Sequence, residues 1–335
     1  MEIVNHETAE TAQPAQPPDS TTSPTKGRDL DFFGSVPCWT PEIEKACQQV
    51  SHWIRCDLPG GMIYGLQRVG KSFCAHYIKE CVPEILGRST LAVGWSIPEM
   101  KRRNECATLA LWHRQSGSQL YNHSKAHILK VRLEDFLVDL ANVAGAKRIS
   151  IIIDEAHWLF EDDYGLLMSV CNDLQMRGKR PFVLLIGHPD LKQHQSNFSA
   201  RNSLQITGRY FAVEHQYHGI QLNDLSDLLV SMDDATGDGV AARHLPWLRA
   251  QGWQLSDLAQ PMKDVIQTMC PAGHKVEDIR VPMQFARASL NAILYELIDA
   301  EQGGPEVSVE LVRDAVLQSG IRDVLHLYAT HTPLQ

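Results

Sequence analysis

Residues 65–72 are Gly-Leu-Gln-Arg-Val-Gly-Lys-Ser, and our expectations for the whole chain start from this stretch. A glycine, four further residues and then Gly-Lys-Ser form a P-loop, in which backbone N–H groups surround phosphate oxygens. The apolar residues 62–64 before it predict a strand, and residues 73–80 after it predict a helix, whose N-terminus favours an anion. This context favours a nucleotide site over an ordinary glycine turn capped by serine.

Each residue type in the loop has a chemical reason. Gly65 and Gly70 allow the tight backbone turn, Lys71 brings an ammonium group to the outer phosphates, and Ser72 offers its hydroxyl to Mg²⁺. We therefore expect ATP and Mg²⁺ as cofactors. The predicted nucleotide-binding residues are Gly65, Leu66, Gln67, Arg68, Val69, Gly70, Lys71, Ser72 and Phe73.

A second stretch, residues 148–155, reads Arg-Ile-Ser-Ile-Ile-Ile-Asp-Glu. Such an apolar, β-branched run is typical of a strand buried on both faces of a parallel sheet, and ligands bind at the carboxyl ends of such strands. Asp154 would hold Mg²⁺ with its water shell, and Glu155 would orient the attacking water. Beside a P-loop, these roles are favoured over a solvated acidic turn.

Composition limits the classes of function. The 335 residues allow one large domain or two, and the 44% hydrophobic content is enough for a full core. The net charge of -9 means that any DNA contact must come from a local basic patch. We expect no membrane span, because no apolar run approaches about 20 residues, and no signal peptide. The eight cysteines contain no C-x-x-C pair, so we expect reduced thiols and a cytoplasmic protein.

The pattern along the chain predicts an α/β fold with a P-loop core, in which a parallel sheet is flanked by helices and a small all-helical lid subdomain follows. From Gly219 onward we expect no further strands. The expected parts are a disordered tail over 1–28, an α/β nucleotide-binding domain over 29–218, a helical lid over 219–320 and a C-terminal tail over 321–335.

The order of these motifs resembles that of the AAA+ ATPases: a P-loop, an Asp-Glu strand, a polar residue at the next strand's end, an arginine and a helical lid. Within that superfamily the chain is similar to the TniB/TnsC group of DNA-transposition regulators over about residues 33–320. The segments that carry the resemblance are 33–37, 65–72, 153–157, 185–191 and 208–211.

The resemblance implies further site residues. His188 falls at sensor 1, where the family more often has Thr or Asn. Arg209 falls at the arginine finger, which reaches the nucleotide of a neighbouring subunit, and Arg201 is the nearby alternative. Arg287 is a candidate for sensor 2, although the glycine of Gly-x-x-Arg is missing and the arginine is displaced. The predicted catalytic residues are Glu155, Lys71, Arg209 and His188.

One basic island interrupts the acidic chain. Residues 95–130 hold six Lys or Arg and two Glu, a net charge of 6 − 2 = +4, and the island is densest at Lys101, Arg102 and Arg103. By the family resemblance, these three residues would grip the backbone of double-stranded DNA without reading its bases. The resemblance also implies self-association into a ring or helical filament, with a transposase and a target-selector protein as partners.

The function predicted from these features is an ATP-dependent, DNA-binding regulator of transposition. It would assemble on target DNA and link target selection to the transposase, and ATP hydrolysis would control disassembly. Turnover would be slow unless the protein is oligomeric and DNA-bound. The alternatives are a nucleotide-gated adaptor with little turnover, or another AAA+ ATPase such as a helicase loader or a secretion-associated ATPase. Residues 154–157, Asp-Glu-Ala-His, also occur in DEAH helicases, but the chain is too short for their two motor domains.

Overall fold

A computed structural model describes the chain over residues 32–33, 38–87, 89–101, 104–119, 121–235, 239–270, 275–299 and 307–329. The tail predicted over residues 1–28 lies outside these described residues, and so do Arg102 and Arg103 of the basic island.

A five-stranded sheet in the order β2-β3-β4-β1-β5 forms the centre of the N-terminal region, and every neighbouring pair in it is parallel. Strand β4 lies between β1 and β3, with Tyr64 opposite Gly187 and Ile153 opposite Leu185. The residues that follow these three strands therefore meet at one edge of the sheet. The strands are β1 (Gly60–Tyr64), β2 (Thr90–Ser96), β3 (Arg148–Asp154), β4 (Arg180–Gly187) and β5 (Glu214–Gln216).

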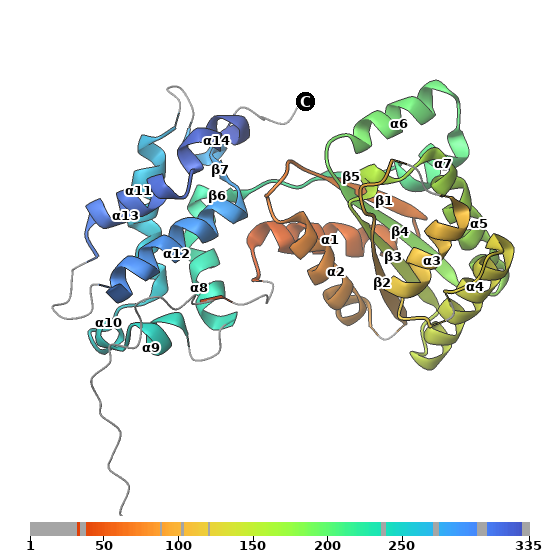
Figure 1. The fold of residues 1–335 in the computed structure, drawn as a ribbon, viewed down its shortest axis with the longest axis horizontal. Helices are drawn as coiled ribbons and strands as arrows, with labels where there is room; N and C mark the ends of the chain where they lie inside the picture. Colours follow the sequence, from red (N-terminus) through yellow and green to blue (C-terminus); the bar gives the residue numbers. More distant parts are fainter. Residues whose placement is uncertain are drawn as a thin grey trace, which may run out of the picture. The chain divides into compact units, whose positions relative to one another are not determined.

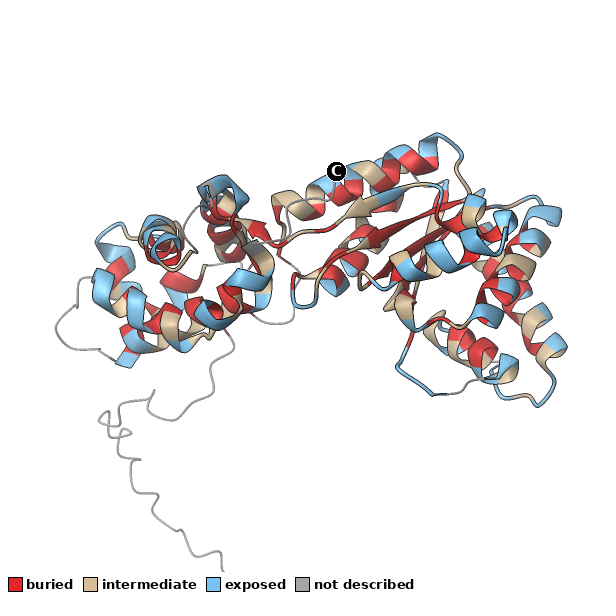
Figure 2. Ribbon diagram, turned by 90° about the horizontal axis from the view of Figure 1, so that it is seen from above, coloured by how far each residue is buried: buried red, intermediate tan, exposed pale blue. Residues whose placement is uncertain are grey.

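Helices cover both faces of this sheet (Figure 1). The alternation along β3 shows why: Ile152 packs with residues of α1 (Pro41–Arg55) and α2 (Lys71–Leu86), whereas Ile151 and Ile153 pack with residues of the opposite layer. The five central residues of β3 are accordingly buried, as the β-branched run predicted, and buried residues run along the sheet (Figure 2). The opposite layer contains α3 (Glu105–Gln115), α4 (Ala126–Val143) and α5 (Glu161–Met176), and α6 (Leu191–Ala200) and α7 (Leu204–Tyr210) follow β4.

The C-terminal region is helical, as predicted. Its helices are α8 (Leu225–Ala235), α9 (Val240–His244), α10 (Pro246–Ala250), α11 (Ala259–Thr268), α12 (Met283–Asp299), α13 (Val309–Gln318) and α14 (Ile321–Ala329). None of the helices within the described ranges is both long and apolar enough to cross a membrane.

Two expectations about this region were wrong. Strands do not stop at Gly219, because β6 (Ile220–Gln221) and β7 (Arg280–Val281) form a short antiparallel pair. Two-residue strands are too short to show a periodic pattern in the sequence. In addition, much of the tail expected over 321–335 is helix α14, whose Ile321 and Leu325 are buried in the lid.

Candidate functional site

The loop between β1 and α2 has the backbone geometry that its glycines predict. Gly70 is left-handed with φ 105°, and so is Arg68 with φ 64°, which is uncommon for a residue other than glycine. At Gly65, a Cβ atom would stand 2.3 Å from the carbonyl oxygen of Tyr217, so only glycine fits there. The glycines of this loop therefore stand where the backbone conformation and the close contact with Tyr217 require them.

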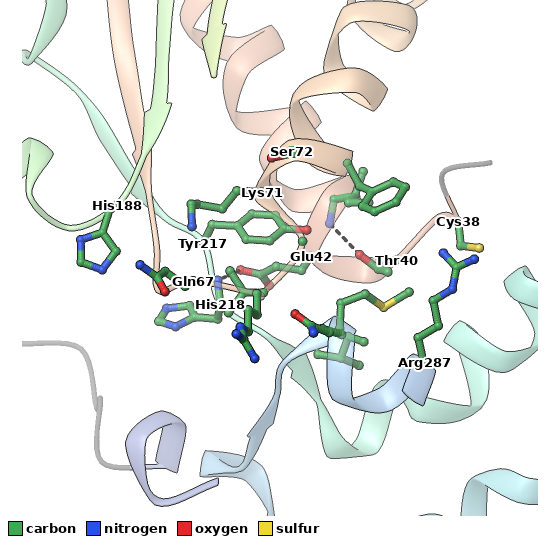
Figure 3. Close-up of a pocket in the computed structure, with 18 of the residues that line it drawn as sticks. Cys38, Thr40, Glu42, Gln67, Lys71, Ser72, His188, Tyr217, His218 and Arg287 are labelled. Atoms are coloured by element: carbon green, nitrogen blue, oxygen red, sulfur yellow. Dashed lines mark hydrogen bonds between the residues drawn. The ribbon is translucent and has the colours of Figure 1, made fainter. Parts of the chain in front are cut away.

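A cavity of about 630 Å³ opens beside the loop (Figure 3). It is lined by Gln67 to Phe73 of the loop, by Glu155 and His188 at the ends of β3 and β4, and by residues of the lead-in to α1 and of α12. Of the predicted nucleotide-binding residues, Gly65 and Leu66 do not belong to the described lining. Gly65 lies against Tyr217 instead.

Lys71 is buried, and its ammonium Nζ donates a hydrogen bond to the carbonyl oxygen of Leu66 at 2.6 Å. Burial lowers the pKa of Lys71, while the nearby carboxyl groups of Glu155 and Asp154 oppose that shift. The loop thus holds a cation inside the cavity wall, hydrogen-bonded to the backbone oxygen of Leu66. Such a group is ready to bind an anion.

Asp154 lies at the end of β3, across from the start of α2. Burial raises the pKa of its carboxyl group, and a hydrogen bond with the side chain of Ser72 opposes this. The N–H of Glu155 also donates to Asp154 Oδ1 at 2.9 Å. Among the described residues no three His, Cys, Asp or Glu side chains gather into a metal site. Mg²⁺ bound to phosphates needs only one or two protein oxygens, so the pair Ser72 and Asp154 fits it.

Glu155 follows in a left-handed conformation, φ 54° and ψ 34°, and its half-buried carboxylate faces the cavity. Its Oε2 lies 3.4 Å from His157 Nδ1. That nitrogen accepts the backbone N–H of His188 at 3.3 Å, which places the imidazole proton on Nε2. Burial also lowers the pKa of His157. The neutral ring therefore leaves Glu155 without an ion pair to this histidine, and the carboxylate can accept a proton or orient a water.

His188 lies at the cavity edge, as its place after β4 predicted, and its Nδ1 is 3.0 Å from Asp190 Oδ2. Arg287 lines the cavity from α12, but its guanidinium lies beside Cys38 and 5.8 Å from the ring centre of Phe33 (Figure 3). The two candidate sensor residues thus lie on different sides of the cavity.

The remaining predicted residues lie elsewhere. Arg209, on α7, donates to Asn172 Oδ1 of α5 at 2.8 Å, and Arg201 pairs with Glu161. Neither arginine belongs to the described lining of the cavity. Lys101 is exposed beyond the end of β2. The structure thus brings together the P-loop, Asp154, Glu155 and His188, and leaves both finger candidates outside the cavity.

Several lining residues were not predicted. Glu42, in the first turn of α1, lines the cavity, and its Oε1 accepts the backbone N–H of His218 at 3.1 Å. Tyr217, His218 and Met283 also line it. They come from segments far apart in the sequence, and none of them belongs to a local motif that would have marked it.

The parallel sheet, the P-loop after its β1 strand and the helical C-terminal region together define the fold of the AAA+ proteins. Among solved structures, the chain is similar to the ORC2 protein of Aeropyrum pernix in its ADPNP-ADP complexes, with TM-score 0.60 and 16% identity over 86% of this chain and 70% of that one. It is also similar to Cdc6p of Pyrobaculum aerophilum, with TM-score 0.57 and 17% identity over 86% and 70%. No protein-family model and no curated protein matches the sequence. At these identities the likeness establishes the fold.

Proposed function

We propose that this chain is an ATPase whose site is the cavity beside the P-loop. The observation that carries the proposal is the meeting of Lys71 and Ser72 with residues more than 80 positions further along the chain. Lys71, Ser72 and Glu155 line one cavity, and Asp154 is hydrogen-bonded to Ser72 beside it. The ADPNP and ADP of the ORC2 structure support a nucleotide as the ligand. The proposal includes a nucleotide-binding domain over 29–218 and a lid over 219–320.

Backbone N–H groups of the loop and the Lys71 ammonium would bind the phosphate oxygens. Ser72 and Asp154 would hold Mg²⁺, which would neutralise charge that develops on the phosphates. Glu155 accepts a hydrogen bond from water and orients its oxygen toward the outermost phosphorus. His188, at the cavity edge, would contact the outer phosphate.

A second copy of the chain would complete the site. Arg209 lies outside its own cavity, and the family resemblance makes it the finger that reaches a neighbour's nucleotide. An arginine finger contributes about 10³–10⁵ in rate, so the isolated subunit should turn over slowly. Arg209→Ala should abolish stimulation by self-association while leaving ATP affinity unchanged. If Arg201→Ala has that effect instead, the assignment moves to Arg201.

We further propose that the assembly, a ring or helical filament, encloses double-stranded DNA in the cytoplasm and links a target selector to a transposase, with hydrolysis driving disassembly. The TniB/TnsC-like motifs support this role. Lys101, Arg102 and Arg103 would contact DNA phosphates. Replacing all three by Ala should weaken binding to every sequence alike and flatten its salt dependence, by about 0.9 in log–log slope per lost contact. Unchanged DNA affinity would reject this surface.

The likeness to ORC2 and Cdc6p favours a second candidate, another DNA-associated AAA+ ATPase such as a helicase loader. A nucleotide-gated adaptor with little turnover is the remaining alternative. A transposase reading frame beside this gene would favour the first role over the second.

The test of the ATPase is steady-state hydrolysis with and without duplex DNA. We expect DNA-stimulated turnover in the wild type, its loss in Glu155→Gln with ATP binding retained, and no change in Glu80→Gln, an exposed carboxylate on α2. ATP-dependent DNA binding without turnover in the wild type would favour the adaptor. Absence of ATP binding with Mg²⁺ present would refute the proposal.

A further inference from the structure

Three consecutive carbonyl groups of the P-loop each accept a hydrogen bond from a different element. Leu66 O accepts from Lys71 Nζ at 2.6 Å, Gln67 O accepts from the Tyr328 hydroxyl at 2.8 Å, and Arg68 O accepts from the backbone N–H of Gln284 at 3.3 Å. The last two donors belong to the C-terminal helices α14 and α12. Helices α12 and α14 therefore supply the donors to two neighbouring carbonyls of the loop.

These contacts also determine the direction of the N–H groups. A trans peptide unit is planar, and its C=O and N–H point in opposite directions. Fixing the Gln67 carbonyl therefore fixes the N–H of Arg68, and fixing the Arg68 carbonyl fixes the N–H of Val69. Gln67, Arg68 and Val69 all line the cavity. The hydrogen bonds from Tyr328 and Gln284 to these carbonyls thus orient the two N–H groups that a phosphate would meet.

The loop needs this support. Arg68 has φ 64°, a conformation that is strained for a residue with a side chain, and Gln67 and Arg68 are exposed. The Arg68 guanidinium carbon lies 5.9 Å from the ring centre of Phe285, which adds a cation–π contact from α12. Tyr328 is itself half-buried against the core beside α1 and α2. Packing of the ring therefore limits the positions that its hydroxyl can take.

We infer that Tyr328 is a positioning residue for phosphate binding: its hydroxyl orients the P-loop N–H groups so that they converge on the phosphates. The inference rests on the proposed nucleotide site. It makes phosphate affinity depend on helix α14, whose Tyr328 is 261 residues from Gln67. Tyr328 itself is not among the residues that line the cavity.

The test is Tyr328→Phe in the full chain, which removes one hydroxyl and keeps the packing of the ring. Dissociation constants for ATP, ADP and adenosine would be measured by titration calorimetry. Loss of one hydrogen bond predicts roughly 2- to 10-fold weaker binding of ATP and ADP, with adenosine binding unchanged. In hydrolysis, KM should rise by a similar factor, and kcat should stay within twofold.

The control is Tyr77→Phe, because that hydroxyl pairs with Cys81 within α2 and lies outside the described cavity lining. It should change none of these constants. Equal ATP affinity in Tyr328→Phe and wild type would overturn the inference and leave the ATP site intact. Equal weakening of ATP and adenosine, or a matching fall in Tm without ligand, would show a general structural role and overturn it too. If the wild type binds neither ATP nor ADP, it is the proposed function that fails.

Discussion

Replacing Gly65 by Ala should destabilise the protein through one backbone contact. The added Cβ would lie 2.3 Å from the Tyr217 carbonyl oxygen, well inside the closest approach that real Cβ atoms show. The backbone is held on both sides of this contact. Gly65 N–H donates to Gly187 O at 3.1 Å, and Tyr217 N–H donates to Tyr64 O at 2.8 Å. The clash must therefore displace the loop or the segment after β5.

Such overpacking costs about 1–3 kcal/mol, which corresponds to a fall in Tm of roughly 1.5–4 °C for a chain of this size. Thermal unfolding by circular dichroism at one scan rate measures it, and ATP affinity should fall because the loop is displaced. Gly165→Ala is the matched control. Nothing lies within 4 Å of the added atom there, and Gly165 lies within α5 and is exposed to solvent. It should gain about 0.5–1 kcal/mol. A Gly65→Ala protein that melts at or above the wild-type temperature would refute this reasoning.

Three further predictions concern charge, capping and pH. Lys71→Met should weaken ATP binding at least tenfold, as measured by titration calorimetry. Tm should stay unchanged or rise, because the substitution removes a buried ammonium that is costly to desolvate. A lower Tm in thermal unfolding would contradict this. Thr40→Ala should cost about 1 kcal/mol in urea unfolding, because Thr40 Oγ1 caps α1 by accepting the Ile43 N–H at 3.1 Å, and an unchanged midpoint would deny the cap a role. Finally, burial holds several histidine pKa values below the ordinary 6.5 in the folded protein, so the unfolded chain takes up protons first and stability should fall as pH drops from about 7 through 6.5 toward those lowered values. A Tm that is equal or higher at pH 5.5 than at pH 7.5 would contradict this. The histidines concerned are His113, His157, His194, His215, His218 and His244.

The sheet and one wall of the site could be predicted because their signals are local. The P-loop spacing fixes a strand, a turn and a helix together, and the run ending at Asp154 shows a strand buried on both faces. Their meeting in space follows from the rule that parallel strands present their carboxyl ends at one edge. Strand β5 gave no such signal, because three residues at a sheet edge, Glu214–Gln216, have neither apolar alternation nor length.

The rest of the cavity could not be predicted, for a different reason. Glu42 looks in sequence like an ordinary acid in the first turn of a helix, which the helix dipole alone explains. Its place on the cavity wall, where it accepts the backbone N–H of His218, appears only in the folded chain. Arg209 poses the opposite problem, because its predicted role depends on a second copy of the chain.

The P-loop motif does not specify the contacts that hold the loop in place. The pattern Gly-x-x-x-x-Gly-Lys-Ser specifies which backbone donors face a phosphate, but a peptide N–H is aimed only when its carbonyl partner is held. Here two of those carbonyls are held by C-terminal helices, through Gln284 of α12 and Tyr328 of α14. A loop of the same sequence without these helices would keep its residue types and lose part of their alignment. Phosphate affinity should therefore change with substitutions in α12 and α14 even where the P-loop sequence is unchanged. Removal of the Tyr328 hydroxyl is the smallest such substitution.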